Sequence, residues 1–364
     1  MTNSIFPEHR PVLPLGPDFP WLAPLAGFSD LPFRLVCRDM GAALACTEMV
    51  SAKGLIYGLG GLEACRARHE RPHGGQTGQG PPVLARADNG TEELLRTTAG
   101  DHPLVVQLFG SDPAFIGLAT SILKERGYDF FDLNMGCSVP KVTKTGAGAA
   151  LLREPQKALA AARALFAAAG PGAAGCKLRL GWDSSAPVYL NLAKALEDQG
   201  AAWITLHPRY ARQAFSGTVD LGALEALAKA VRIPVLASGD LFRAEDALDR
   251  LERGAAGVMF GRGAMANPAI FRRYLLLRRG ESCPDALPAP DLLRLVRRHA
   301  ALQREYSPAG QGRSGLAPGL LKMRTVVPRY LRHLPGVKQL RLALTRCASW
   351  EELDAILNEF FREH

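Results

Sequence analysis

The sequence predicts a (β/α)8 barrel of the TIM-barrel class, followed by a small C-terminal all-α domain. Three observations lead to this prediction. Eight short strand-like runs occur before Gly261, amphipathic helical stretches separate them, and the last part of the chain shows helical spacing alone. Alternating strands and helices favour parallel pairing with right-handed crossovers, and eight strands close a barrel of about 250 residues.

The predicted strands are short apolar runs, each followed by a helical pattern. Ala- and Leu-rich stretches with helical periodicity occupy residues 155–169, 187–199 and 221–231. An open doubly wound sheet is the alternative, but it would normally carry G-x-G-x-x-G after its first strand. Residues 23–27, Ala-Pro-Leu-Ala-Gly, do not match that pattern. The predicted strands are residues 21–25, 42–47, 104–109, 129–133, 175–180, 202–206, 234–237 and 256–260.

One segment interrupts the predicted barrel. Residues 68–88 are rich in Gly, Pro, His and Gln and lack any periodicity. Such a composition predicts a mobile surface insertion ahead of the third strand, because it offers little apolar surface to bury. With this insertion included, the predicted barrel domain spans residues 1–280.

A second break separates the barrel from the C-terminal helices. Residues 280–290 contain three prolines and indicate a linker. Helical spacing follows over residues 291–305 and 350–361, with Asp291 and Ser349 as the expected N-caps. The predicted helical domain spans residues 291–364, and its basic side chains include Lys322, Arg324, Arg329, Arg332, Lys338 and Arg341.

The composition excludes several classes of protein. The chain has 364 residues, of which 47% are hydrophobic, yet no run approaches the ~20 apolar residues that span a bilayer. Residues 1–20 lack the apolar core of a signal peptide, so the cytoplasm is the expected location. The seven cysteines are scattered and never form C-x-x-C, which argues against a disulfide framework, a zinc site or an iron–sulfur cluster. We expect no metal and no membrane association.

The charge balance is strongly basic. The net charge is +9 and the isoelectric point is about 9.3. An excess of Lys and Arg attracts phosphates over long distances and favours a nucleic-acid partner. The alternative is an Arg-rich composition that reflects a GC-rich genome.

A single cysteine follows the fourth predicted strand. Cys137 ends the run Asp-Leu-Asn-Met-Gly-Cys that begins at Asp132, and Lys141 and Lys144 come shortly after it. Catalytic groups in a barrel come from this end of the strands. A thiol with cations beside it there could meet a polyanionic substrate.

The last two predicted strands end in glycine-containing turns. Ser238, Gly239 and Asp240 follow the seventh strand, and Gly261 and Arg262 follow the eighth. Glycine lets a backbone approach a ligand closely, and the loops after strands seven and eight of a barrel frequently bind phosphate. Arg262 could add a bidentate charge. Ordinary turn chemistry is the alternative.

Three polar residues lie within or at the ends of other predicted strands: Gln107, Lys177 and His207. A lone glutamine or histidine is more often structural than functional. A lysine inside an apolar strand is harder to dismiss, because burying an unpaired ammonium costs several kcal/mol. A barrel rim with amide, ammonium and imidazole groups beside a phosphate clamp suits flavin mononucleotide (FMN).

These motifs, in this order and spacing, resemble those of bacterial tRNA-dihydrouridine synthases. The resemblance covers the chain from Trp21 to its C-terminus, apart from residues 68–88. It departs from the usual family pattern at Ser138, at Ser238 and at Thr325-Val326. The motifs that carry it are residues 23–34 (Ala-Pro-Leu-Ala-Gly-Phe-Ser-Asp-Leu-Pro-Phe-Arg), 134–137 (Asn-Met-Gly-Cys), 141–148 (Lys-Val-Thr-Lys-Thr-Gly-Ala-Gly), 177–179 (Lys-Leu-Arg), 207–209 (His-Pro-Arg), Gly239-Asp240 and Gly261-Arg262.

The resemblance implies an FMN barrel and a helical domain that together grip tRNA. NADPH would reduce the flavin, the reduced flavin would deliver hydride to C6 of a uridine, and Cys137 would donate the proton to C5. The cofactor residues implied by the family are Pro24, Leu25, Ala26, Gln107, Lys177, His207, Ser238, Gly239, Asp240, Gly261 and Arg262. The residues expected to face substrate or tRNA are Asn134, Lys141, Lys144, Arg179, Arg209, Arg212 and Arg324.

Two alternatives of different classes stay open. One is an FMN barrel that reduces or oxidises a free pyrimidine or another small enone, which would not need the basic tail. The other is an RNA-binding protein that kept the barrel and lost turnover. Nothing in the sequence indicates an obligate protein partner, so we expect a monomer. Because the thiol must keep its proton to donate it, we expect Lys141 and Lys144 to face tRNA phosphate and not the sulfur.

Overall fold

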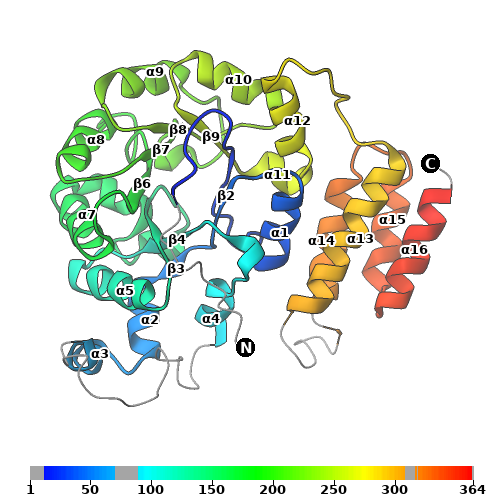
Figure 1. Cartoon of the computed structure of the whole chain (residues 1–364), viewed down its shortest axis with the longest axis horizontal. Helices are drawn as coiled ribbons and strands as arrows, with labels where there is room; N and C mark the ends of the chain where they lie inside the picture. The colour runs from blue at the N-terminus through cyan, green and yellow to red at the C-terminus, as the bar shows by residue number, and fades with distance from the viewer. Residues whose placement is uncertain (1–11, 70–88, 308–315, 318, 363–364) are drawn as a thin grey trace.

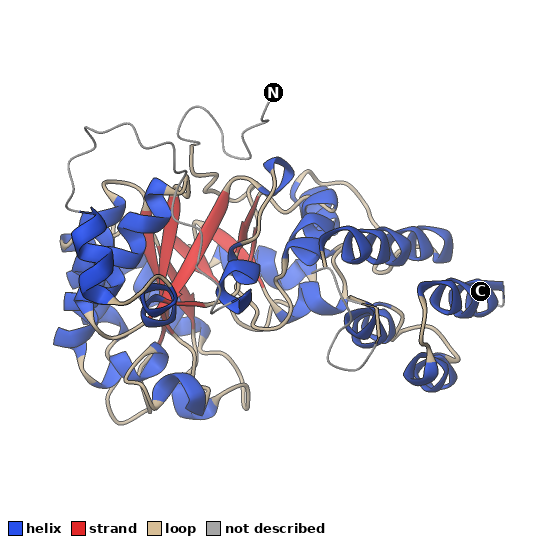
Figure 2. Cartoon of the chain, turned by 90° about the horizontal axis from the view of Figure 1, so that it is seen from below, coloured by secondary structure: helices blue, strands red, loops and turns tan. Residues whose placement is uncertain are grey.

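The computed structural model describes residues 12–69, 89–307, 316–317 and 319–362, and its core is a closed parallel barrel (Figures 1 and 2). The strand order is β2-β1-β9-β8-β7-β6-β5-β4-β3, and β2 also pairs with β4, which closes the sheet. The strands are β1 Trp21–Leu22, β2 Leu44–Cys46, β3 Val50–Ser51, β4 Leu104–Phe109, β5 Phe130–Met135, β6 Ala174–Arg179, β7 Ile204–His207, β8 Val235–Ala237 and β9 Gly257–Phe260.

The barrel has eight strand positions although nine strands are present. β2 pairs with the start of β4, where Ala45 lies opposite Leu104, and β3 pairs with its end, where Val50 lies opposite Leu108. β2 and β3 therefore occupy one position that is interrupted at residues 47–49. The predicted (β/α)8 fold is confirmed, whereas the two-residue strand β3 was missed because it is too short to show a pattern.

The helices surround the barrel and then continue as a C-terminal group of four. Short 3₁₀ turns lie at η1 Ala99–Asp101, η2 Gly148–Arg153 and η3 Ala211–Gln213. The barrel helices are α1 Leu31–Asp39, α2 Ala52–Gly58, α3 Leu62–His69, α4 Asn89–Leu95, α5 Pro113–Glu125, α6 Pro140–Thr143, α7 Pro155–Ala169, α8 Tyr189–Asp198, α9 Leu221–Ala230, α10 Ala244–Glu252, α11 Arg262–Ala266 and α12 Ile270–Arg278. The C-terminal group is α13 Ala289–Tyr306, α14 Leu320–Tyr330, α15 Val337–Arg346 and α16 Trp350–Arg362.

Three local predictions need correction. Arg68 and His69 belong to the end of α3, and the rest of the predicted insertion, residues 70–88, lies outside the described residues. The predicted linker ends at Pro288, because α13 begins at Ala289. Asp291 is therefore in the first turn of α13 and is not its N-cap, since the proline before it suits a first helical turn.

The prediction for α16 agrees with the structure at its start. The Ser349 hydroxyl accepts a hydrogen bond of 3.1 Å from the Glu352 backbone N–H. This bond satisfies one of the N–H groups that a helix leaves free in its first turn.

A cluster of apolar side chains that includes two tryptophans fills the interior of the barrel. Trp21 of β1 and Trp203 meet edge to face, with ring centroids 5.5 Å apart. A Cβ on Gly175 would lie 2.3 Å from Cε2 of Trp203, so the indole needs a glycine on β6. This cluster fills the barrel interior, and in barrel enzymes ligands bind at the carboxyl ends of the strands. The interior cluster comprises Trp21, Ala23, Leu44, Cys46, Val105, Phe130, Trp203, Leu236 and Met259.

The C-terminal helices pack on one side of the barrel (Figure 1). α13 contacts α1, and α14 contacts both α13 and the short helix α11. α11 directly follows β9, so α14 lies close to the carboxyl end of the barrel. Among the described residues, no helix combines the length and the apolar character that crossing a membrane requires.

A buried ion pair ties α1 to the segment before β4. The Arg34 guanidinium donates to the Asp101 carboxylate at 2.7 and 2.9 Å, and both side chains are at most 1% exposed. It also donates to the carbonyls of Ser29 and Arg96, so each of its three guanidinium nitrogens has at least one acceptor. Removing one partner of such a pair strands a charge without solvent.

We expect Asp101→Asn to lower the free energy of unfolding by about 3 kcal/mol, measured by chemical denaturation, because Arg34 would stay charged and buried. Glu63→Gln is the control, since Glu63 is paired with Arg66 at 3.3 Å but is 86% exposed. We expect that change to cost less than about 1 kcal/mol. Equal effects of the two substitutions would contradict the prediction.

Candidate active site

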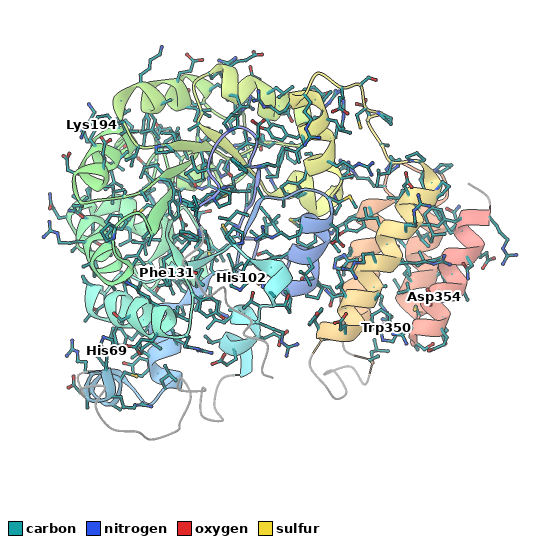
Figure 3. The ribbon with its side chains drawn as sticks, in the orientation of Figure 1. His69, His102, Phe131, Lys194, Trp350 and Asp354 are labelled. Atoms are coloured by element: carbon teal, nitrogen blue, oxygen red, sulfur yellow. The ribbon has the colours of Figure 1, made fainter. Side chains whose placement is uncertain are left out.

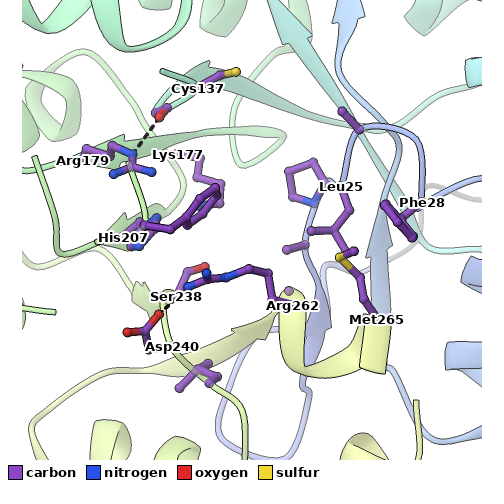
Figure 4. Close-up of a pocket in the computed structure, with 18 of the residues that line it drawn as sticks. Leu25, Phe28, Cys137, Lys177, Arg179, His207, Ser238, Asp240, Arg262 and Met265 are labelled. Atoms are coloured by element: carbon purple, nitrogen blue, oxygen red, sulfur yellow. Dashed lines mark hydrogen bonds and ion pairs between the residues drawn. The ribbon is translucent and has the colours of Figure 1, made fainter. Parts of the chain in front are cut away.

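A cavity of about 410 Å³ opens at the carboxyl ends of the barrel strands. Residues near the ends of β5, β6 and β7, or in the segments that follow β1, β5, β7, β8 and β9, line it, which is the arrangement that barrel enzymes use for catalysis. In Figure 4, Cys137 lies at one end and Asp240 at the other, with Lys177, Arg179 and His207 between them and Leu25, Phe28 and Met265 on the facing side.

The structure brings most of the predicted site residues to this one cavity. Gln107, Lys141, Lys144, Arg209, Arg212 and Arg324 are not among its lining residues. The predicted residues that line it are Pro24, Leu25, Ala26, Asn134, Cys137, Lys177, Arg179, His207, Ser238, Gly239, Asp240, Gly261 and Arg262.

Asn134 holds the turn that presents Cys137. Its Oδ1 accepts hydrogen bonds from the backbone N–H of Gly136 at 3.1 Å and of Cys137 at 2.9 Å. The Cys137 carbonyl in turn accepts from the Ala149 N–H at 2.9 Å. A side chain that caps the turn after β5 in this way keeps the thiol at the rim, half-buried in the cavity wall.

Gln107 lies beneath the cavity and not in its wall. It is completely buried, its Nε2 donates to Asp132 at 2.6 Å, and its Oε1 accepts from Asn134 Nδ2 at 2.7 Å. Burial raises the pKa of Asp132 to about 7 despite the bond from Gln107. In this structure Gln107 connects Asp132 to Asn134 directly beneath the cavity, and its expected contact with a flavin ring stays a prediction.

β6 places two cations beside the thiol. Burial lowers the pKa of Lys177 to about 8, and the nearby Arg179 adds to this shift. Arg179 donates to the carbonyls of Gly136 at 2.9 Å and Tyr210 at 3.0 Å, so it joins the turn after β5 to the loop after β7. Burial also lowers the pKa of Arg179, to about 10.

The lowered pKa of Lys177 predicts a pH dependence of stability. Between pH 8 and the ordinary value of 10.5, the unfolded chain holds a proton that the native lysine has released. The unfolded state then binds more protons, so this group makes the free energy of unfolding rise with pH in that window. Chemical denaturation of the flavin-free protein should show that Lys177→Met loses this rise, whereas the control Lys194→Met on the exposed face of α8 keeps it. Identical pH profiles of the three proteins would contradict the prediction.

His207 ends β7 as a neutral imidazole. Burial and the positive charges of Lys177 and Arg179 hold the pKa of His207 far below its usual value. Gly239 lies directly against the ring: a Cβ there would be 2.4 Å from Cδ2 of His207, and the φ of Gly239 is +92°. The turn after β8 therefore needs glycine at this position for two independent reasons.

The Asp240 carboxylate forms ion pairs with two arginines, Arg209 and Arg262. It accepts from Arg209 at 2.5 and 2.8 Å and from Arg262 at 2.5 Å. Burial acts to raise the pKa of Asp240, but the bonds and charges of Arg209 and Arg262 hold it below its usual value. The Arg209 side chain is only 1% exposed, so it orders this end of the site and is not placed to contact tRNA, contrary to our expectation.

Two exposed aromatic residues pack on Arg262 at the rim, and the sequence did not indicate them. The Arg262 guanidinium lies 4.2 Å from the ring centroid of Phe215 and 5.0 Å from that of Phe242. Both rings line the cavity although they are 57% and 44% exposed. Cation–π contacts of this kind restrain Arg262. In the sequence, the only sign of such a contact is that each phenylalanine stands alone in a loop.

The remaining basic candidates are divided between the surface and the interior. Lys141, Lys144 and Arg212 are exposed outside the cavity, where they remain free to meet phosphate. Arg324 instead donates to the Cys347 carbonyl within the C-terminal helices. One nitrogen of its guanidinium is therefore already bound within the helices, and its expected role toward tRNA stays a prediction.

Comparison with known proteins shows a family match over most of the chain. The family described as Dihydrouridine synthase (Dus) matches residues 21–71 and 82–364. The chain belongs to this family. As a member it is 30% identical over 344 residues to tRNA-dihydrouridine synthase B of Pseudomonas aeruginosa, covering 94% of this chain and 92% of that protein. It is 32% identical to tRNA-dihydrouridine synthase B of Pseudomonas syringae pv. tomato, covering 94% and 91%.

The chain also resembles a shorter-matching relative and a solved enzyme structure. A probable tRNA-dihydrouridine synthase of Treponema pallidum is 34% identical to this family member over 263 residues, which is 70% of this chain and 69% of that one. Among solved structures, morphinone reductase in complex with tetrahydroNAD matches with a TM-score of 0.46 and 15% identity. That match covers 74% of this chain and 88% of the other.

Proposed function

We propose that this protein reduces uridine to 5,6-dihydrouridine in tRNA, with FMN as the bound cofactor and NADPH as the reductant. One observation carries the proposal. Cys137 lines the same cavity as the turns at Ser238–Asp240 and Gly261–Gly263. A proton donor and a phosphate-binding end thus face one space, as reduction of a flat base beside a flavin requires. The membership in the family and the names of its relatives support the same activity.

The residues at the Asp240 end of the cavity fit FMN. The backbone N–H groups of Gly239 and Asp240 donate no hydrogen bond to any described residue, and they lie beside the arginine pair. Free N–H groups beside arginines suit a phosphate. Ser238, Gly239, Asp240, Gly261 and Arg262 would hold the phosphate end, and Pro24, Leu25, Ala26, Lys177 and His207 would hold the ring. When bound, FMN supplies the hydride for C6 of the uracil.

The protein itself supplies the proton and the electrostatic setting. As C6 is reduced, negative charge develops at C5 and O4 of the uracil, and the Cys137 thiol donates its proton at C5. The cations of Lys177 and Arg179 on the neighbouring strand would stabilise this charge, because Arg179 is buried and Lys177 lines the same cavity at a half-buried position. Arg179 also donates to the carbonyl of Gly136, the residue before Cys137. This bond keeps the guanidinium and the thiol at a fixed distance from each other.

Exposed basic residues would bind the rest of the tRNA. Lys141, Lys144 and Arg212 lie outside the cavity and are free to contact phosphates. A uridine inside folded tRNA must be swung out to reach the cavity, at a cost of a few kcal/mol. Phosphate contacts around the rim would offset that cost.

The test uses the purified full chain and tRNA from a strain that lacks dihydrouridine. We expect the protein to carry FMN, NADPH to bleach the flavin under anaerobic conditions, and the tRNA to gain dihydrouridine, detected by mass spectrometry of its nucleosides. A colourless protein that binds no added FMN would refute the proposal. Reduction of free uridine as fast as tRNA would refute the role of tRNA and favour a small-enone reductase.

A further inference from the structure

Lys322 differs from the exposed basic residues of the C-terminal helices, such as Arg329, Arg332, Lys338 and Arg341. It lies near the start of α14, yet its side chain is only 20% exposed. Its Nζ donates to the Gly27 carbonyl at 2.5 Å and pairs with Asp30 at 3.1 Å, both in the loop between β1 and α1. A lysine held in this way is not free to follow a phosphate backbone.

The loop that Lys322 grips forms one wall of the cavity. Pro24, Leu25, Ala26 and Phe28 all line it, and Figure 4 shows Leu25 and Phe28 on the side that faces His207. Lys322 Nζ lies 5.2 Å from the ring centroid of Phe28. A residue of the helical region thus touches both the backbone and an aromatic side chain of the wall.

The barrel binds the same residue, Gly27, through its N–H group. The Gly27 N–H donates to a Glu48 carboxylate oxygen at 2.5 Å, while the Gly27 carbonyl accepts from Lys322. Glu48 lies in the break between β2 and β3, in sequence next to the cavity residue Met49. Each hydrogen-bonding group of Gly27 is therefore bound, one by the barrel and one by α14.

Two more contacts tie this loop to the helical region. Gln303 of α13 donates to Asp30 at 3.0 Å, and the Arg329 guanidinium of α14 lies 4.9 Å from the Phe28 ring centroid. Asp30 also caps α1 by accepting from the Phe33 N–H at 3.2 Å. α13 and α14 therefore add three side-chain contacts, from Lys322, Gln303 and Arg329, to the bonds that the barrel itself makes with this loop.

We propose that Lys322 is a positioning residue for the reaction: by holding Gly27, Phe28 and Asp30 it sets the wall of the cavity against which the flavin and the uracil are aligned. This inference rests on the proposed function. A basic residue of the C-terminal helices would ordinarily be expected to bind tRNA phosphate. The inference instead gives Lys322 the task of holding a loop of the barrel. It also makes the geometry of the site depend on the docked helices.

The first test needs neither cofactor nor activity. Hydrogen–deuterium exchange is measured on the flavin-free protein for peptides that cover residues 23–30. We expect Lys322→Met to speed exchange in this segment on the order of tenfold, because the loop loses the Lys322 contacts with Gly27 and Asp30. Lys322→Arg can still donate to Gly27 and pair with Asp30, so it should restore most of the protection.

The matched control is Lys194→Met, the same change on the exposed face of α8. Figure 3 shows Lys194 on the side of the barrel away from Trp350 and Asp354 of the C-terminal helices. We expect exchange of residues 23–30 to be unchanged in this variant. Unchanged exchange in Lys322→Met as well would overturn the inference, whatever the protein catalyses.

The second test separates positioning from tRNA binding. We expect Lys322→Met to lower kcat about 10- to 100-fold, because small misplacements of aligned groups are that costly. The salt dependence of tRNA binding should stay the same. A lost phosphate contact would instead weaken binding and reduce the salt slope by about one, and that result would overturn the inference.

The two proposals fail in different ways. If the wild type forms no dihydrouridine, the proposed function is wrong and the reaction-level role of Lys322 falls with it. If the wild type is active and Lys322→Met keeps its kcat, only the inference about Lys322 is wrong. A double variant adds a further check: in Phe28→Leu, the effect of Lys322→Met on kcat should shrink, because both changes disturb the same wall.

Discussion

Replacing Cys137 with alanine is expected to lower the rate of dihydrouridine formation in tRNA by about 10²–10⁴-fold, the range that a positioned proton donor contributes. The thiol lies at the end of the cavity away from Asp240, and its turn is held by Asn134 and Arg179. Alanine removes the donor and leaves both of those restraints, since they bind backbone atoms only. The fold and FMN binding should therefore persist.

Single-turnover kinetics can separate the two halves of the reaction. We expect bleaching of the flavin by NADPH to be unchanged in Cys137→Ala, while reoxidation by tRNA becomes slow. Cys283→Ala is the matched control, because Cys283 is also a free, partly exposed thiol but lies in the segment between α12 and α13. Wild-type rates in Cys137→Ala would show that another group donates the proton.

The second large effect is expected at Gly239. In Gly239→Ala the new methyl group would lie 2.4 Å from the His207 ring, at a φ of +92° that L-residues rarely adopt. Either the turn after β8 or the imidazole must move, and both line the cavity. We expect FMN affinity to fall at least about tenfold, a loss of about 1.4 kcal/mol, measured by equilibrium titration of the flavin-free protein.

Gly200→Ala separates backbone strain from the clash. Gly200 has a φ of +100° after α8, but a Cβ there meets nothing within 4 Å. It should cost only the strain of a left-handed residue, about 1–2 kcal/mol in the free energy of unfolding, with no change in FMN affinity. If both variants bind FMN as tightly as the wild type, the turn after β8 does not form part of the cofactor site.

Much of the fold was predictable because it depends on local patterns. The eight predicted strands all correspond to observed strands, and the stretch 155–169 matches α7 at both ends. Alternating apolar runs and helical periodicity have few other solutions than a parallel barrel. β3 escaped because two residues carry no period, and the start of α13 was placed late because Pro290 obscured its first turn.

The site was predictable in its membership but not in its contacts. Strand-end chemistry brought Cys137, Lys177 and Gly239 to one predicted rim, and they line one cavity. The destinations of Arg209, Gln107 and Lys322 were not predictable. A long polar side chain binds whichever partner the packed chain brings near it, and here the partners are Asp240, Asp132 and Gly27.

The sequence by itself determined the class of fold and the chemical groups at the ends of its strands, because both follow from spacing along the chain. Tertiary structure alone decided which cations face the cavity, which are neutralised inside the protein, and which hold a wall of the site from another part of the chain. Phe215, 57% exposed and packed on Arg262, shows the difference. Hydrophobic periodicity acts over a few residues, whereas these contacts join residues far apart in sequence that meet only when the barrel closes and the helices dock.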